Sequence, residues 1–205
     1  MKDKSKIKYN LIVGIVGQIV SIVLGVVLPK LVMTSYGSEV NGLLSSVTNI
    51  YAYIAIVESG IAAASCQALY NPIAENAKDK INRVLSATHR YYRRTGLIYF
   101  GLVLLFAAIY PVSIQTEIPY YKIAAIVLFN GIGNVINYFF HGKYLILLKA
   151  DGKNYIRTGM EMLTNAAKQI LKILLIGWGY DVVSVQMVAM AVSFAQMAYI
   201  TWYIK

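Results

Sequence analysis

Two lysines occupy costly positions inside a mostly apolar stretch of the C-terminal third of the chain. Lys168 and Lys172 are preceded by Glu161 and Asn165, at a spacing that keeps all four on one helix face. The nearest arginine before Lys172 is 15 residues away, which is roughly 22 Å of helix, so Lys172 is far from a polar boundary on that side. Because lysine is a common point-charge partner for phosphate, the pattern favours a cationic site for an anionic substrate. The alternative is an internal ion pair with Glu58 or Glu161.

A second polar stripe lies in the preceding apolar stretch. Asn130, Asn134, Asn137 and His141 follow one another at spacings that place them on a single helix face. Such a stripe avoids lipid by facing a water-filled cavity or another helix, and asparagines also join helices by hydrogen bonds. Both interpretations of the asparagines stay open, whereas His141 is expected near the membrane interface.

One carboxylate interrupts an otherwise uncharged run. Glu58 is the only charged residue between Val40 and Leu69. An isolated carboxylate in hydrocarbon is expensive and is normally buried with a partner. We therefore expect Glu58 to face the protein interior and to have a function there.

The composition points to a membrane protein. The chain has 205 residues, of which 58% are hydrophobic and 14% charged, and a mean hydropathy of +0.58, whereas soluble domains carry about 25% charged residues. The net charge of +10 therefore indicates basic cytoplasmic loops rather than a nucleic-acid partner. A single cysteine, Cys66, and two histidines give no cluster with metal-ligand spacing. We predict no metal, no cofactor and no catalytic residues, and hence no enzyme.

Apolar run lengths predict an all-helical membrane protein with six spans, since about 20 apolar residues cross a bilayer. The predicted helices cover about residues 9–33, 40–69, 95–116, 119–149, 154–180 and 182–204, with a basic amphipathic cytoplasmic segment at about 75–94. Fifteen of the 19 basic residues fall on one side of this arrangement. The positive-inside rule therefore predicts that both termini are cytoplasmic.

Several stretches resemble a known family. The chain reads "LPKLVMTSYGSEVNGLLSSVTNI", "VESGIAAAS", "LYNPIAENAKDKINRVLSATHRYYRRTG" and "LLKADGKNYI". Together these resemble the N-terminal half of bacterial polysaccharide flippases, the oligosaccharide flippase family of the multidrug/oligosaccharidyl-lipid/polysaccharide exporter superfamily. The resemblance runs from about Lys8 to the C-terminus, and residues 37–96 are its most specific part.

This resemblance implies one lobe of a two-lobed transporter in the bacterial inner membrane, because alternating access needs two units around a shared site. The second six-helix lobe would be the rest of a longer chain or a second copy. The implied substrate is an undecaprenyl-diphosphate-linked oligosaccharide that crosses to the outer leaflet for surface polysaccharide synthesis. Lys168 and Lys172 would hold the phosphates, and Glu58 and Glu161 would balance charge or carry a coupling ion. The neutral polar groups of the expected cavity are Asn130, Asn134, Asn137 and Asn165.

Three other functions stay open at this point. One is a multidrug exporter of the same superfamily, although exporters of organic cations favour acidic cavities and this chain places more lysine than acid in its spans. The second is a non-transporting membrane scaffold for polysaccharide assembly, and the third is a membrane-embedded transferase.

Overall fold

The chain folds entirely into helices where its structure is described. The computed structural model describes residues 2–136, 146, 147, 149, 150 and 154–204; the side chains of residues 2–10, 55–59, 61, 154–157 and 199–204 are outside this description. The long helices are α1 (Lys2–Tyr36), α2 (Ser38–Ala74), α3 (Lys78–Ser113), α4 (Tyr120–Ile136), α6 (Asn154–Gly177) and α7 (Val182–Ile204). The predicted all-helical class is confirmed for these residues.

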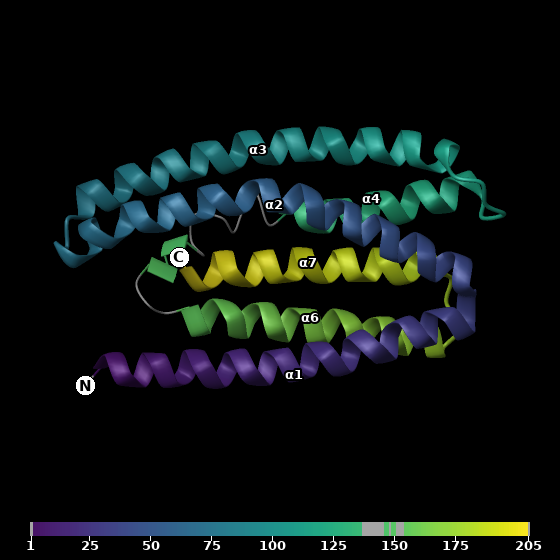
Figure 1. The fold of residues 1–205 in the computed structure, drawn as a ribbon, viewed down its shortest axis with the longest axis horizontal. Helices are drawn as coiled ribbons and strands as arrows, with labels where there is room; N and C mark the ends of the chain where they lie inside the picture. Colours follow the sequence, from purple (N-terminus) through teal and green to yellow (C-terminus); the bar gives the residue numbers. More distant parts are fainter. Residues whose placement is uncertain (1, 137–145, 148, 151–153, 205) are drawn as a thin grey trace.

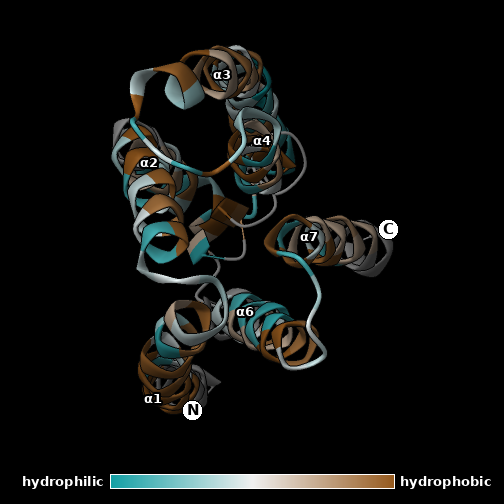
Figure 2. Cartoon of the chain, turned by 90° about the vertical axis from the view of Figure 1, so that its right-hand side faces the viewer, coloured by the Kyte–Doolittle hydropathy of each residue, from teal (hydrophilic) through white to brown (hydrophobic). Residues whose placement is uncertain are grey.

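The helices form an elongated bundle in which they run along a common axis (Figure 1). Contacts between neighbours run from α1 to α2, α3, α4, α7 and α6 and back to α1, so the helices close into a ring, and α2 also contacts α4. Viewed along the axis, α2, α3 and α4 lie on one side and α1 and α6 on the other (Figure 2). A closed ring of helices can enclose a central cavity.

The two ends of the bundle differ in what they carry. Both termini lie at one end (Figure 1), together with the turn at residues 75–77; we call this the terminal end. The opposite end holds Gly37 and the loops at residues 114–119 and 178–181, and we call it the Gly37 end.

The reversal between α1 and α2 is made by one residue. Helix α1 ends at Tyr36, α2 begins at Ser38, and Gly37 between them has a φ of +89°. Glycine adopts this positive φ without the steric cost that a Cβ would bring. The turn therefore brings two helices of 35 and 37 residues side by side with almost no connecting loop.

Helix α3 contains most of the expected amphipathic segment at about 75–94 and of the expected span at 95–116. Its 36 residues, Lys78–Ser113, form one continuous helix, in which the amphipathic stretch leads into the span. The run between them contains no proline, and its glycine, Gly96, is tolerated within the helix. The buried residues of α3 follow one stripe along its whole length: Thr88, Tyr92, Gly96, Tyr99, Val103, Ala107 and Pro111.

A glycine sets the distance between α4 and its neighbours. A Cβ added to Gly131 would lie 2.5 Å from Val103 Cγ1 and 2.7 Å from the Tyr51 hydroxyl. Val103 and Tyr51 are both buried, and the Tyr51 hydroxyl donates to the Val127 carbonyl at 3.0 Å. Helix α4 therefore packs against α2 and α3 at a separation that a larger residue would prevent.

The outer surface of the bundle is strongly apolar. Two helical stretches among the described residues are long and apolar enough to cross a membrane, Leu11–Tyr36 in α1 and Lys78–Ser113 in α3. Only 6% of the most apolar 18-residue window of the first is buried against the rest of the chain. The apolar stretches Tyr120–Ile136 and Val182–Ala198 are shorter. The exposed apolar face of α1 is typical of a helix that lies against lipid, and the brown ribbons in Figure 2 show the same character.

Candidate functional site

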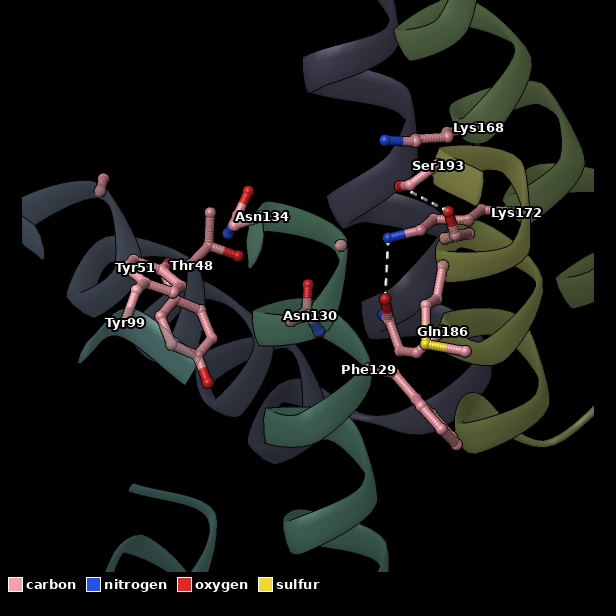
Figure 3. Close-up of a pocket in the computed structure, with 14 residues that line it drawn as sticks. Thr48, Tyr51, Tyr99, Phe129, Asn130, Asn134, Lys168, Lys172, Gln186 and Ser193 are labelled. Carbon is pink, nitrogen blue, oxygen red and sulfur yellow. Dashed lines mark hydrogen bonds between the residues drawn. The ribbon is translucent and has the colours of Figure 1, made fainter. Parts of the chain in front are cut away.

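A cavity of about 410 Å³ lies inside the ring of helices. It is bordered by α2, α3, α4, α6 and α7, and the close-up in Figure 3 shows the side chains that line it. Its polar lining residues are Thr48, Tyr51, Tyr99, Asn130, Asn134, Lys168, Lys172, Gln186 and Ser193. Two of these are cationic and the others are uncharged, so the described lining carries positive charge only.

The two lysines enter this cavity from α6. Lys168 and Lys172 are four residues apart on the same face, about 6 Å along the helix axis, and both ammonium groups point from α6 toward α4 (Figure 3). Lys172 Nζ donates a hydrogen bond to Gln186 Oε1 of α7 at 2.9 Å. The lysine side chain therefore extends into the bundle and not out to the Gly37 end.

The partner of Lys172 is neutral. Gln186 is buried, with 4% of its surface exposed, and its amide oxygen satisfies one of the three donors of the ammonium group without cancelling its charge. Among the side chains that the structure describes, ion pairs join Lys80 to Glu75 and Lys122 to Asp181, and neither involves Lys168 or Lys172. The cavity thus offers two cations, one helical turn apart, to an anion.

A second cavity, of about 360 Å³, adjoins the first toward the Gly37 end. The two cavities share Thr48, Asn130, Lys172 and Gln186 in their linings. The second one adds amide and hydroxyl groups from α2 and apolar side chains from α1, α6 and α7. Lys172 stands where the two cavities meet, so a ligand larger than a phosphate can contact it from either side.

Hydrogen bonds close the bundle at the Gly37 end. Tyr36, which lines the second cavity, donates its hydroxyl proton to the Tyr180 carbonyl at 2.5 Å. Glu39 of α2 accepts hydrogen bonds from the Thr116 hydroxyl at 2.5 Å and from the Glu117 backbone N–H at 3.3 Å. These contacts tie the α1–α2 turn to both loops at this end.

An ion pair joins α4 to the α6–α7 loop at the same end. Lys122 Nζ lies 2.8 Å from Asp181 Oδ1. Partial burial by itself raises the pKa of Asp181, but the hydrogen bond from Lys122 and backbone N–H groups outweigh it and hold that pKa below its ordinary value. Asp181 is therefore a stable anion that fixes the start of α7.

Four of the predicted site residues meet around the first cavity: Asn130, Asn134, Lys168 and Lys172. Asn165 is exposed and lies on α6 toward the terminal end, beyond this cavity. Glu161 is partly buried and makes interactions, but it is absent from the described linings of both cavities. Asn137 and the side chain of Glu58 lie outside the described residues.

Asn130, which lines both cavities, is partly engaged by its own helix. Asn130 Nδ2 donates to the Ile126 carbonyl at 3.0 Å. Its side-chain oxygen is then left as an acceptor at the junction of the two cavities. Asn130 therefore supplies a neutral polar wall and no charge.

Gln186, which contacts Lys172, is not among the site residues that the sequence predicts. The signal was present: Gln186 and Ser193 are seven residues apart in an apolar stretch, so they share one face of α7, and both are buried. The sequence also does not predict the aromatic cluster beside the cavity, in which the Tyr51 ring packs on the Tyr99 and Phe106 rings at centroid distances of 5.9 and 5.8 Å. Tyrosines are common at membrane interfaces, so their position in a core is not evident from sequence.

Comparisons with protein-family models, with curated proteins and with solved structures found no match for this chain.

Proposed function

We propose that this chain is a six-span membrane lobe of a transporter that flips undecaprenyl-diphosphate-linked oligosaccharides from the inner to the outer leaflet of a bacterial inner membrane. One observation carries the proposal: Lys168 and Lys172 project into an internal cavity whose described lining contains no carboxylate. Lys172 has a neutral amide as its hydrogen-bond partner, which offsets only part of a desolvation cost of several kcal/mol for a buried ion. A bound anion would offset that cost.

The diphosphate is the part of such a lipid that cannot enter hydrocarbon unaided. Fixed ammonium groups replace the water that the phosphates lose, which lowers the barrier to crossing. Two lysines one turn apart can each contact one phosphate of a diphosphate. The uncharged lining groups, such as Asn134 and Ser193, can hydrogen-bond to sugar hydroxyls without forming ion pairs with the lysines.

The acidic residues have a supporting role in this proposal. Glu58 and Glu161 balance the lysines or carry a coupling ion when the cavity is empty. The transporter is completed by a second six-helix lobe, either further along a longer chain or in a second copy. An exporter of organic cations fits less well, because the described lining of the cavity is cationic.

Reconstitution tests the proposal. The complete natural translation product is placed in vesicles that contain a fluorescent undecaprenyl-diphosphate-linked saccharide, and the rate at which label reaches the other leaflet is measured by chemical quenching. Lys172→Gln should lower the rate by about tenfold or more, since a hydrogen bond to a charged group is worth about 1.5–3 kcal/mol. Lys172→Arg should keep part of it, because the charge remains and the geometry changes.

The matched control is Lys30→Gln, which removes the same charge from an exposed position on α1 and should leave the rate unchanged. Vesicles with wild-type protein that flip no faster than protein-free vesicles would contradict the proposal. Equal loss in Lys30→Gln and Lys172→Gln would show that overall charge, and not this cavity, matters.

A further inference from the structure

The half of α3 near the terminal end carries a second basic feature, separate from the internal cavity. A shallow depression of about 310 Å³ on the outside of the bundle is lined by Ala87, Arg90, Tyr91 and Arg94. Arg90 and Arg94 are exposed and one helical turn apart, so their guanidinium groups flank one small region. Arginine pairs of this kind suit the planar, bidentate recognition of a phosphate group.

This basic feature lies on an exposed face of α3, where Arg90, Tyr91 and Arg94 are all exposed. The buried stripe that includes Thr88, Tyr92 and Tyr99 packs inward. Arg90 and Arg94 each come two residues after a member of that stripe. Two residues correspond to a rotation of roughly 200° around the helix axis, so both arginines lie on the side opposite the stripe. The depression therefore opens outward, away from the bundle core.

The same outward face becomes apolar directly after Arg94. Leu97 and Ile98, three and four residues further on, are 58% and 67% exposed, and Leu105 is 55% exposed. Between them Gly101 is exposed and has no atom within 4 Å of where a Cβ would stand. One face of the helix thus presents two cations followed by an open apolar strip.

The position of the change from basic to apolar matches a membrane boundary. From Arg94 to Ser113, the end of α3, are 19 residues, which is about 28 Å of helix and close to the roughly 30 Å thickness of a hydrocarbon core. With α3 as a span, Arg90 and Arg94 lie at headgroup level. Tyr91 lies beside them, held by a T-shaped contact with the buried ring of Tyr92 at a centroid distance of 6.4 Å.

We propose that this face of α3 is a binding site for one anionic phospholipid. Arg90 and Arg94 hold the phosphate, Tyr91 packs beside the glycerol region, and an acyl chain lies along the apolar strip over Gly101. The apolar strip favours a lipid over a free phosphate ion, because only a ligand with an acyl chain gains binding energy from apolar contacts. The inference rests on the proposed membrane location of α3 and is independent of the flippase activity.

Native mass spectrometry of the full chain, released from detergent micelles, tests the site directly. The protein is titrated with dioleoyl phosphatidylglycerol, and in separate arms with dioleoyl phosphatidylcholine and with inorganic phosphate. Wild type should retain phosphatidylglycerol more strongly than phosphatidylcholine. Because a hydrogen bond to a charged group is worth about 1.5–3 kcal/mol, Arg90→Gln and Arg94→Gln together should weaken its retention by about a hundredfold or more.

The chain offers a matched control on the same helix. Arg93 is also exposed but is absent from the lining of the depression, so Arg93→Gln removes one charge and should leave retention unchanged. Replacing Arg90 and Arg94 by lysine keeps the charge and should retain part of the affinity. Thermal melting verifies that each variant is folded.

Three results would overturn the inference. Equal weakening by Arg93→Gln and by Arg90→Gln would show only diffuse electrostatic attraction. Displacement of phosphatidylglycerol by inorganic phosphate would identify a site for soluble anions, and equal retention of phosphatidylcholine would remove the role of headgroup charge. If the chain retains phosphatidylglycerol normally but does not flip lipid-linked saccharide, the proposed transport function is contradicted and the lipid site on α3 is supported.

Discussion

The charge balance of the internal cavity depends on single side chains. Lys172 is held by the neutral amide of Gln186 at 2.9 Å. A carboxylate at that position would satisfy the same lysine more strongly and would cancel its charge. The amide is therefore the choice that positions the ammonium group while keeping it available for an anion.

We expect Gln186→Glu to stabilise the protein and to weaken the binding of undecaprenyl diphosphate. Binding should fall roughly tenfold to a hundredfold, since about 1.5–3 kcal/mol of charge-assisted hydrogen bonding is lost to the new ion pair. Equilibrium binding and thermal melting of the purified chain measure the two effects. Gln186→Met is the matched control, because it removes the acceptor but leaves the positive charge. If both variants weaken binding equally, the shape of the cavity and not its charge is responsible.

At the scale of elements, the close approach of α4 to α2 and α3 holds the cavity wall in place. We predict that Gly131→Ala destabilises the bundle, because the new methyl group would overlap Val103 and the Tyr51 hydroxyl. Overpacking of a tight core costs about 1–3 kcal/mol, which denaturant unfolding in detergent can measure. Gly133→Ala is the control on the same helix, since its nearest neighbour would be Ser193 Oγ at 3.4 Å. Equal stability of both variants would contradict the close packing.

The ion pair between Lys122 and Asp181 gives the Gly37 end a dependence on pH. The folded pKa of Asp181 lies below its ordinary value of 3.8, so the unfolded chain binds the proton more readily. The stability from this pair is therefore present above about pH 4 and is lost as the pH falls through the folded pKa. Asp181→Asn should remove that part of the acid dependence of the melting temperature. An unchanged acid profile in the variant would show that the pair contributes nothing, as many surface ion pairs do.

Some features of the helices and of the site can be predicted from the sequence, and others cannot. The helical class and the inward position of Lys168 and Lys172 follow from periodicity, because a polar stripe on an apolar helix has to find polar surroundings. The same reasoning placed Asn165 with them, yet Asn165 is exposed, because the cavity ends before that turn of α6. The spacing of residues predicts which face of a helix a side chain occupies. It does not predict where along the helix axis a cavity begins.

Helix α3 continues without a break from a basic stretch into an apolar one. The helical spacing of Ile81, Val84 and Leu85 predicts an amphipathic lead-in to the span that starts near Thr95. The backbone responds to breakers and to packing, and the stripe from Thr88 to Pro111 packs without interruption. Contacts between distant parts, such as Lys172 with Gln186 or Tyr51 with Val127, depend on the order of helices around the ring, which hydropathy does not encode.

At the scale of the whole molecule, the distribution of basic residues predicts how the bundle sits in a membrane. The terminal end carries most of them, including the six on α3 from Lys78 to Arg94. We predict that this end is cytoplasmic. A reporter enzyme that is active only in the periplasm should be silent when fused after Lys205 and active when inserted in the loop at residues 114–119. Strong activity after Lys205 would overturn this orientation and the proposed direction of transport.

The central claim is that Lys168 and Lys172 form an internal site for a lipid-linked diphosphate, and binding of undecaprenyl diphosphate to the full chain in micelles tests it most directly. The account predicts that Lys168→Gln combined with Lys172→Gln weakens this binding by about a hundredfold or more, with about 1.5–3 kcal/mol lost at each lysine. The exposed-lysine control, Lys30→Gln, should bind like wild type. Wild-type affinity in the folded double variant would contradict the account.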